Sequence, residues 1–113
     1  MIKQKKLYDL ICIGAGSGGM GVGRKAAGYG KKVAMIENKK IGGTCVNVGC
    51  VPKKVMFNLA TFMEHSQVMQ SYGLSLGETK LDFGAFKRAR DAYVGRLNGI
   101  YMNNIKGQNI DFY

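Results

Sequence analysis

The stretch Leu-Ile-Cys-Ile-Gly-Ala-Gly-Ser-Gly-Gly at residues 10–19 decides the fold. It begins inside the apolar run Leu7–Ile13, which is typical of a buried parallel strand. A helical pattern from Met20 to Tyr29 follows, Gly30 is placed to end it, and Val33–Ile36 predicts a second strand. A strand, a helix and a strand in this order make a βαβ unit, so the sequence predicts an α/β fold with a parallel sheet.

The glycines at positions 14, 16 and 19 form a G-x-G-x-x-G pattern between the first strand and the helix. Gly14 permits a tight turn, Gly16 lets the backbone approach a pyrophosphate, and Gly19 lets helix and strand pack closely. The helix N-terminus offers free N–H groups and partial positive charge to phosphates. Glu37, at the end of the second strand, is placed to bind ribose hydroxyls. The pattern favours a dinucleotide site over a glycine-rich turn of another α/β fold, and it does not separate NAD from FAD.

Two long helices are predicted downstream. The first runs from Val51 to about Gln70, and Pro52 suits its first turn because the missing N–H has no helical partner there. The second runs from Phe83 to about Lys106, with Asp82 as its N-cap. A strand begins at Ile110–Tyr113, which leaves an incomplete sheet. We therefore expect residues 1–113 to be the N-terminal part of a longer protein.

Composition excludes several classes of function. A chain of 113 residues holds one domain at most. The net charge of +10 comes from scattered lysines and arginines without an RNA-binding or zinc-finger pattern, so we expect an anionic cofactor and substrate rather than a nucleic acid. No apolar run approaches about 18 residues, so we expect no membrane segment. The expected location is the cytoplasm, with a mitochondrial form left open.

The stretch Gly-Gly-Thr-Cys-Val-Asn-Val-Gly-Cys-Val-Pro-Lys-Lys at residues 42–54 carries the chemistry. Cys45 and Cys50 could bind a metal, form a redox disulfide or be two inert buried thiols. A metal site needs about four ligands, and only Cys12 and His65 could add to the pair. In a reducing compartment a close cysteine pair is more often catalytic than a structural disulfide. A redox disulfide is therefore favoured, and no metal is expected.

Geometry sets a condition on that disulfide. Residues five apart in a regular helix are separated by roughly 7.5 Å of rise, more than the usual Cα span of roughly 4.4–6.8 Å for a disulfide. Bridging therefore needs an irregular turn, which Gly49 can supply. The helix N-terminus and the nearby Lys53 and Lys54 are expected to favour the thiolate form of the cysteines.

The stretch at residues 42–54 resembles the active-site signature of the FAD-dependent pyridine nucleotide–disulfide oxidoreductases. Its Val-Pro-Lys-Lys ending most resembles the glutathione reductases of that family. The resemblance extends over the whole chain, including Gly-Ser-Gly-Gly at 16–19, the Glu37 position and the segment Leu97–Asn104. It implies that residues 1–113 form the N-terminal part of a Rossmann-like FAD-binding domain. Thioredoxin and trypanothione reductases share most of the cysteine motif and remain alternatives.

The resemblance also implies a role for each matching residue. Cys45 would attack the substrate disulfide, Cys50 would lie next to the flavin, and Lys53 would lie beside the flavin N5. Glutathione would be contacted by Ser17, Arg24 and Tyr101. Contacts to FAD would come from Gly14, Gly16, Ser17, Gly18, Gly19, Glu37, Gly43, Thr44, Cys45 and Lys53.

The implied activity is reduction of glutathione disulfide by NADPH through FAD and a Cys45–Cys50 disulfide, which keeps the glutathione of the cell reduced. In the family the NADPH-binding domain, the dimerisation domain and a catalytic His–Glu pair lie beyond the position of Tyr113. We therefore expect a homodimeric parent protein and an inactive 113-residue piece. The alternative from another class is a non-catalytic fragment that binds FAD.

Overall fold

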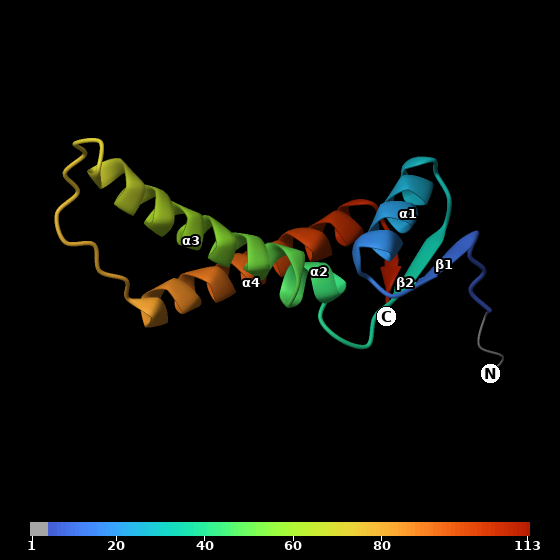
Figure 1. Cartoon of the computed structure of the whole chain (residues 1–113). Helices are drawn as coiled ribbons and strands as arrows, with labels where there is room; N and C mark the ends of the chain where they lie inside the picture. Colours follow the sequence, from blue (N-terminus) through green and yellow to red (C-terminus); the bar gives the residue numbers. More distant parts are fainter. Residues whose placement is uncertain (1–4) are drawn as a thin grey trace.

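The structure is a computed structural model that describes residues 5–113 (Figure 1). Three strands and four helices make up this part of the chain. In chain order they are β1 (Leu10–Ile13), α1 (Ser17–Gly28), β2 (Val33–Ile36), α2 (Gly43–Asn47), α3 (Cys50–Gln70), α4 (Phe83–Gly107) and β3 (Asp111–Phe112). None of the helices within residues 5–113 is both long enough and apolar enough to cross a membrane.

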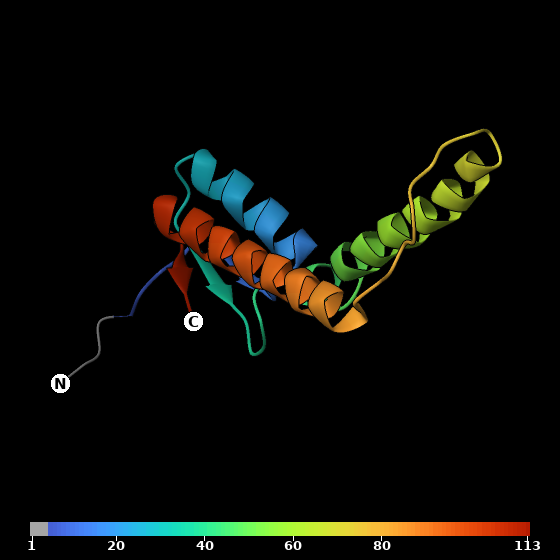
Figure 2. The same cartoon turned by 90° about the vertical axis from the view of Figure 1, so that its left-hand side faces the viewer.

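The strands form one parallel sheet in the order β1-β2-β3. Leu10 pairs with Val33 in the first ladder, and Ala34 pairs with Asp111 in the second. Helix α1 connects β1 to β2, and α4 leads into β3. Helix α1 lies beside the C-terminal half of α4 (Figure 2). The predicted α/β fold with a βαβ unit and an incomplete parallel sheet is confirmed.

The hydrophobic core lies between the sheet and these two helices. Its largest fully buried side chains include Met35 and Val33 of β2 and Ile105 of α4. Burying such a side chain contributes about 1.5–3 kcal/mol. The strands also carry exposed apolar side chains: Ile13 is 89% exposed and Ile11 is 54% exposed. Parallel sheets are normally covered on both faces, so residues 5–113 leave part of this sheet uncovered.

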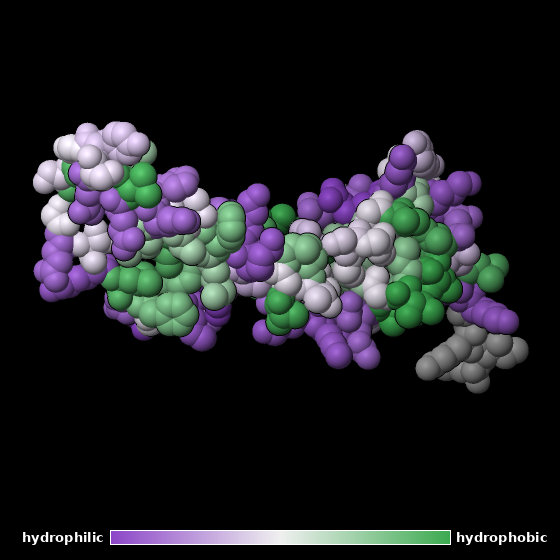
Figure 3. All heavy atoms as spheres, viewed as in Figure 1, coloured by the Kyte–Doolittle hydropathy of each residue, from purple (hydrophilic) through white to green (hydrophobic). Residues whose placement is uncertain are grey.

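A helical hairpin made of α3 and the first half of α4 projects away from the βαβ unit, and the molecule measures 75 × 27 × 19 Å (Figure 1). The start signals that the sequence predicts for α3 and α4 are both confirmed. Pro52 lies in the first turn of α3, and the Asp82 carboxylate accepts a 2.9 Å hydrogen bond from the Ala85 N–H. Apolar residues gather at two places on the face seen in Figure 3, over the hairpin and over the βαβ unit. Helix α3 of the hairpin carries exposed apolar side chains, such as Phe62, which is 62% exposed.

The element boundaries differ from the predicted ones near the glycine-rich turn. The first strand begins at Leu10 rather than Leu7. Leu7 is not paired with β2 and is 74% exposed. Helix α1 begins at Ser17 rather than Met20, so part of the glycine run forms its first turn. Helix α2 was not predicted at all. The third strand is shorter than predicted and comprises Asp111 and Phe112.

Candidate active site at the cysteine pair

The turn between β1 and α1 has the geometry that its glycines predict. Gly14 has a φ of 103°, a conformation that residues with a side chain rarely adopt. A Cβ added to Gly19 would lie 1.9 Å from the carbonyl oxygen of Gly14, so the helix can pass this close only without a side chain. Ser17 and Gly18 lie in the exposed first turn of α1, next to these glycines.

The Glu37 carboxylate is fixed beside this turn by two backbone groups. Its Oε2 accepts a 2.9 Å hydrogen bond from the Ala15 N–H, and its Oε1 accepts one of 2.9 Å from the Lys39 N–H. The Ala15 N–H, and after it the Lys39 N–H, lower the pKa of Glu37 below its usual value. The side chain is therefore ionised at neutral pH, and each oxygen keeps a lone pair for another donor.

A pocket of about 480 Å³ opens next to Glu37 and extends to α2. This volume lies within the usual range of roughly 300–1,000 Å³ for small-ligand sites. The pocket brings Glu37 together with two more of the predicted cofactor-binding residues. It is lined by Glu37, Lys39, Lys40, Gly43, Thr44, Asn47 and Val48.

The glycine-rich turn and the cysteine stretch meet backbone to backbone. The Gly42 N–H donates a 2.8 Å hydrogen bond to the Ala15 carbonyl. Gly43 has a φ of 62°, and a Cβ added there would lie 2.9 Å from the Cα of Gly16. Glycine is therefore needed on the cysteine side of this contact. The contact places the helix that carries Cys45 directly against the predicted pyrophosphate turn.

The two cysteines lie on different helices. Cys45 is half-buried on α2, and Cys50 is exposed as the first residue of α3. The chain is irregular between them, with Gly49 at φ −122° and ψ −112°, where an added Cβ would come within 2.9 Å of the Thr44 carbonyl oxygen. The predicted break at Gly49 is confirmed. Both thiols are free, and they lie close enough for the Cys45 thiol to act on the pKa of Cys50.

The neighbouring thiol changes the expected ionisation of Cys50. The hydrogen bond with the Cys45 thiol, followed by desolvation, raises the pKa of Cys50 above its usual value. Lys53 acts in the opposite direction, and its effect is smaller. Lys53 therefore favours the thiolate of Cys50, as expected, but the Cys45 thiol and desolvation outweigh it, so the net shift of the Cys50 pKa is opposite to the expected one. In the dithiol state a neighbouring thiol governs its ionisation.

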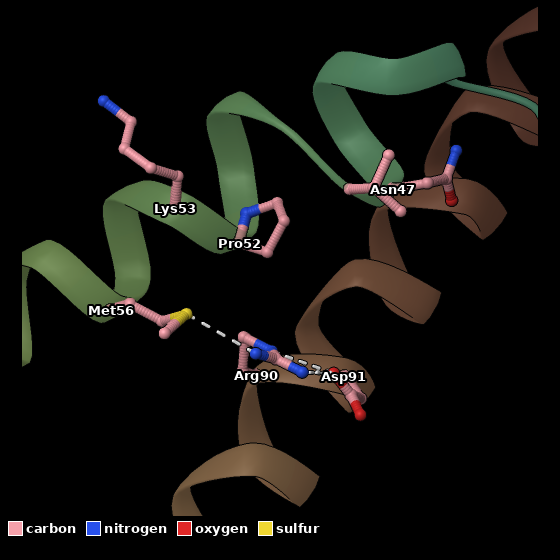
Figure 4. Close-up of a pocket in the computed structure, with 7 residues that line it drawn as sticks. Asn47, Pro52, Lys53, Met56, Arg90 and Asp91 are labelled. Atoms are coloured by element: carbon pink, nitrogen blue, oxygen red, sulfur yellow. Dashed lines mark hydrogen bonds and ion pairs between the residues drawn. The ribbon is translucent and has the colours of Figure 1, made fainter.

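Lys53 projects from α3 into solvent. It lines a pocket of about 410 Å³ between α3 and α4, together with Pro52 and Met56. Figure 4 shows its side chain pointing away from Arg90, which contacts the Met56 sulfur and pairs with Asp91. The exposed ammonium of Lys53 lies close enough to Cys50 to act on its pKa. The predicted role of Lys53 beside a flavin stays a prediction.

The three predicted substrate residues come together in a separate pocket of about 310 Å³, which is lined by Ser17, Met20, Gly21, Arg24 and Tyr101. Sequence reasoning missed Gln108, which follows α4. The Gln108 Oε1 accepts a 2.8 Å hydrogen bond from the Arg24 Nε, and its Nε2 donates to the Arg24 carbonyl at 3.4 Å. Gln108 therefore holds the guanidinium of Arg24 from one side.

Sequence reasoning also missed a pair of amides beside the cysteines. Asn47 ends α2, and Asn98 lies on α4, 51 residues away in the sequence. The Asn98 Nδ2 donates to the Asn47 Oδ1 at 3.0 Å. No spacing rule connects residues so far apart, so only the structure could reveal this contact. Among residues 5–113, no cluster of side chains suited to hold a metal ion is present.

Comparisons with known proteins agree with this geometry. Residues 8–112 match the family model "Pyridine nucleotide-disulphide oxidoreductase". The chain is 52% identical to glutathione reductase of Debaryomyces hansenii, over 93% of this chain and 23% of that protein. It is 47% identical to glutathione reductase of Yarrowia lipolytica, over 93% of this chain and 23% of that protein. It is 45% identical to glutathione reductase of Schizosaccharomyces pombe, over 95% of this chain and 24% of that protein.

The chain thus spans about a quarter of the length of these curated relatives. The family match, in contrast, runs from the start of the βαβ unit through β3 and includes both cysteines. By this match, the chain belongs to the pyridine nucleotide-disulphide oxidoreductase family.

Proposed function

We propose that this chain forms the FAD-binding, disulfide-bearing part of a glutathione reductase, an enzyme that reduces glutathione disulfide with NADPH. The observation that carries the proposal is the placement of Cys45 and Cys50 on either side of a broken helix turn, next to the glycine-rich turn. The relatives named glutathione reductase support glutathione disulfide as the substrate. NADPH would bind outside residues 1–113, in a protein that acts as a homodimer.

The residues present fit FAD. Gly16 and Gly43 meet backbone to backbone next to the N-terminus of α1, and free N–H groups at a helix N-terminus suit a phosphate. The Glu37 carboxylate is fixed and ionised where a ribose would lie. Gly14, Gly19 and the first turn of α1 would hold the pyrophosphate, and the pocket with Thr44 would hold the adenosine part. Bound FAD would accept a hydride equivalent and supply two electrons to the protein disulfide.

The chemistry of the two thiols is a disulfide exchange in two steps. In the first, the Cys45 thiolate attacks one sulfur of glutathione disulfide; that S–S bond breaks, a Cys45–glutathione mixed disulfide forms, and one glutathione leaves and takes a proton. In the second, the Cys50 thiolate attacks the Cys45 sulfur and releases the second glutathione, which also takes a proton. The protein dithiol is oxidised to a disulfide, and glutathione disulfide is reduced to two thiols.

The pocket with Arg24 fits the carboxylates of a glutathione moiety. Its guanidinium can form charge-assisted hydrogen bonds to a carboxylate, and the Ser17 and Tyr101 hydroxyls add neutral partners. Gln108 engages the Nε of Arg24, which leaves the outer nitrogens for a ligand.

The test is NADPH-dependent reduction of glutathione disulfide by the full-length protein and its cysteine variants. Cys45→Ser and Cys50→Ser are each expected to lower kcat by at least about a thousandfold, because each removes one partner of the exchange. Cys12→Ala serves as the control, because Cys12 is a buried residue of the hydrophobic core on β1. Unchanged turnover in Cys50→Ser would refute the proposal, and turnover only with thioredoxin or trypanothione would replace the substrate.

A further inference from the structure

We propose that Asn98 is a positioning residue for the redox pair: it holds the short helix that carries Cys45 so that this cysteine stays placed to form a disulfide with Cys50. The inference rests on the proposed function, because it assigns Asn98 a part in setting the dithiol–disulfide equilibrium. Asn98 is half-buried on α4 and touches neither cysteine in any hydrogen bond that the described residues make. Its influence would therefore pass through α2.

Helix α2 cannot hold its own position. It has five residues, whereas isolated helices shorter than about 12–15 residues are marginal in water. Its N-cap is Gly42, which offers no side chain to accept a hydrogen bond from the first turn. Val46 is its one buried residue among those described, 2% exposed and packed against the backbone of Gly42. Contacts from other elements must therefore fix the orientation of α2.

The packing of Gly42 and Gly43 against the glycine-rich turn supplies some of these contacts, and a clasp of two amides, Asn47 and Asn98, supplies those to α4. The Asn98 Nδ2 donates to the Ile41 carbonyl at 2.7 Å and to the Asn47 Oδ1 at 3.0 Å, so both of its amide hydrogens are engaged. The Asn47 Nδ2 donates to the carbonyls of Gly43 at 2.9 Å and Ile41 at 3.1 Å. Figure 4 shows the Asn47 side chain extending from the end of α2 toward α4. The clasp thus joins both ends of α2 to α4.

The clasp is anchored in the core. Ile41 is 8% exposed and belongs to the main hydrophobic cluster, so its carbonyl is a fixed point. Asn47 and Asn98 both donate to that carbonyl, one from α2 and the other from α4. Cys45 lies two residues before Asn47 on a helix of less than two turns. A shift of the Asn47 amide therefore moves the Cys45 sulfur relative to the first residue of α3.

Disulfide formation depends strongly on this placement. A disulfide needs its Cβ atoms about 3.5–4.5 Å apart and a narrow dihedral range. If α2 is held, the two thiols meet at a high effective concentration, and the disulfide is favoured. If α2 is loosened, forming the disulfide must also order the helix, and the equilibrium moves toward the dithiol. Loss of the Asn98 donors is expected to weaken disulfide formation about tenfold, which corresponds to a reduction potential about 30 mV less negative.

The experiment is a redox titration of the full-length protein with mixtures of reduced and oxidised dithiothreitol. Oxidation of the protein dithiol breaks two S–H bonds and forms the Cys45–Cys50 bond. Two electrons and two protons pass to the disulfide of oxidised dithiothreitol. Asn98→Asp keeps the shape and loses the donors, and Asn98→Ala removes the side chain without adding charge. Both are expected to shift the potential by about 30 mV in the same direction. Asn103→Asp, at an exposed position on the same helix, is the matched control and is expected to leave the potential unchanged.

Two further variants keep the inference testable. Asn47→Ala opens the same clasp from α2, so it gives the answer even if Asn98 variants do not fold. The double variant Asn47→Ala/Asn98→Ala is expected to shift the potential by about as much as one substitution alone, because both remove one unit. A merely structural role would lower the unfolding midpoint and leave the potential at the wild-type value, and that result would overturn the inference.

The outcomes also separate this inference from the proposed function. A wild-type pair that forms no disulfide in the titration would overturn both. A pair whose potential shifts in the Asn98 variants, in a protein that fails to reduce glutathione disulfide, would overturn the proposed function and support the positioning role.

Discussion

The closest backbone approach in the glycine-rich turn leads to a paired stability prediction. Gly19 and Gly21 lie in the same helix, α1, two residues apart. A Cβ added to Gly19 would lie 1.9 Å from the carbonyl oxygen of Gly14 and 3.1 Å from its carbonyl carbon. A Cβ added to Gly21 meets nothing within 4 Å. The substitutions Gly19→Ala and Gly21→Ala therefore share their helix propensity and differ only in this contact.

The magnitudes follow from these two surroundings. Replacing glycine by alanine inside a helix stabilises the folded state by about 1 kcal/mol. Gly21→Ala is expected to gain that amount. Gly19→Ala gains the same, but a contact of 1.9 Å with backbone must be relieved by moving the turn. Such overpacking typically lowers the free energy of unfolding by about 1–3 kcal/mol, and we expect about 3 kcal/mol for Gly19→Ala. The two variants should therefore differ by about 3 kcal/mol, with Gly19→Ala less stable than the wild type by about 2 kcal/mol.

Urea unfolding followed by circular dichroism measures this difference, provided that the slope of the transition is the same in both variants. FAD affinity provides a second readout, because moving the Gly14 carbonyl also displaces the predicted pyrophosphate turn. Equal stabilities of Gly19→Ala and Gly21→Ala would refute the reasoning, since they would show that Gly19 is not in close contact with the turn at Gly14.

Three further predictions concern ionisation and substrate binding. The lowered pKa of Glu37 means that its carboxylate stabilises the fold above about pH 4.5 and loses this effect as the pH falls through the lowered pKa. Glu37→Gln should therefore lower the unfolding free energy by about 1 kcal/mol at pH 7. In acid, the unfolding free energy of this variant should approach that of the wild type. Because the Cys45 thiol is the main cause that raises the pKa of Cys50, Cys45→Ala should move the pH profile of Cys50 alkylation to lower pH, and a profile that stays in place would contradict the contact. Arg24→Gln should raise the KM for glutathione disulfide about tenfold with a smaller change in kcat, whereas Lys25→Gln, at an exposed neighbouring position outside the pocket, should change neither.

Local spacing was sufficient to predict the βαβ unit and its turn. Gly14 and Gly19 act within six residues of each other, and their roles depend only on the strand before them and the helix after them. The same holds for the Asp82 cap and for Pro52 in the first turn of α3. The need for a break at Gly49 followed from the dimensions of a helix and a disulfide alone, and the structure confirms it.

What could not be predicted depends on contacts between distant residues. Helix α2 has no propensity signal, because Gly43 begins it and amides on separate helices hold it. The contact between Arg24 and Gln108 joins residues 84 positions apart. The direction of the Cys50 pKa shift depends on the approach of a second sulfur, which the sequence alone does not show. In each case tertiary placement, rather than residue type, determines the property.

The central claim is that Cys45 and Cys50 form one redox couple between NADPH and glutathione disulfide. Alkylation with iodoacetamide, followed by mass spectrometry of the full-length protein, tests it most directly. Both cysteines should resist alkylation in the oxidised protein, both should react after addition of NADPH, and both should be protected again after glutathione disulfide is added. Buried Cys12 should stay unreactive throughout and serves as the internal control. If the alkylation of Cys45 and Cys50 is the same in all three states, the account is contradicted.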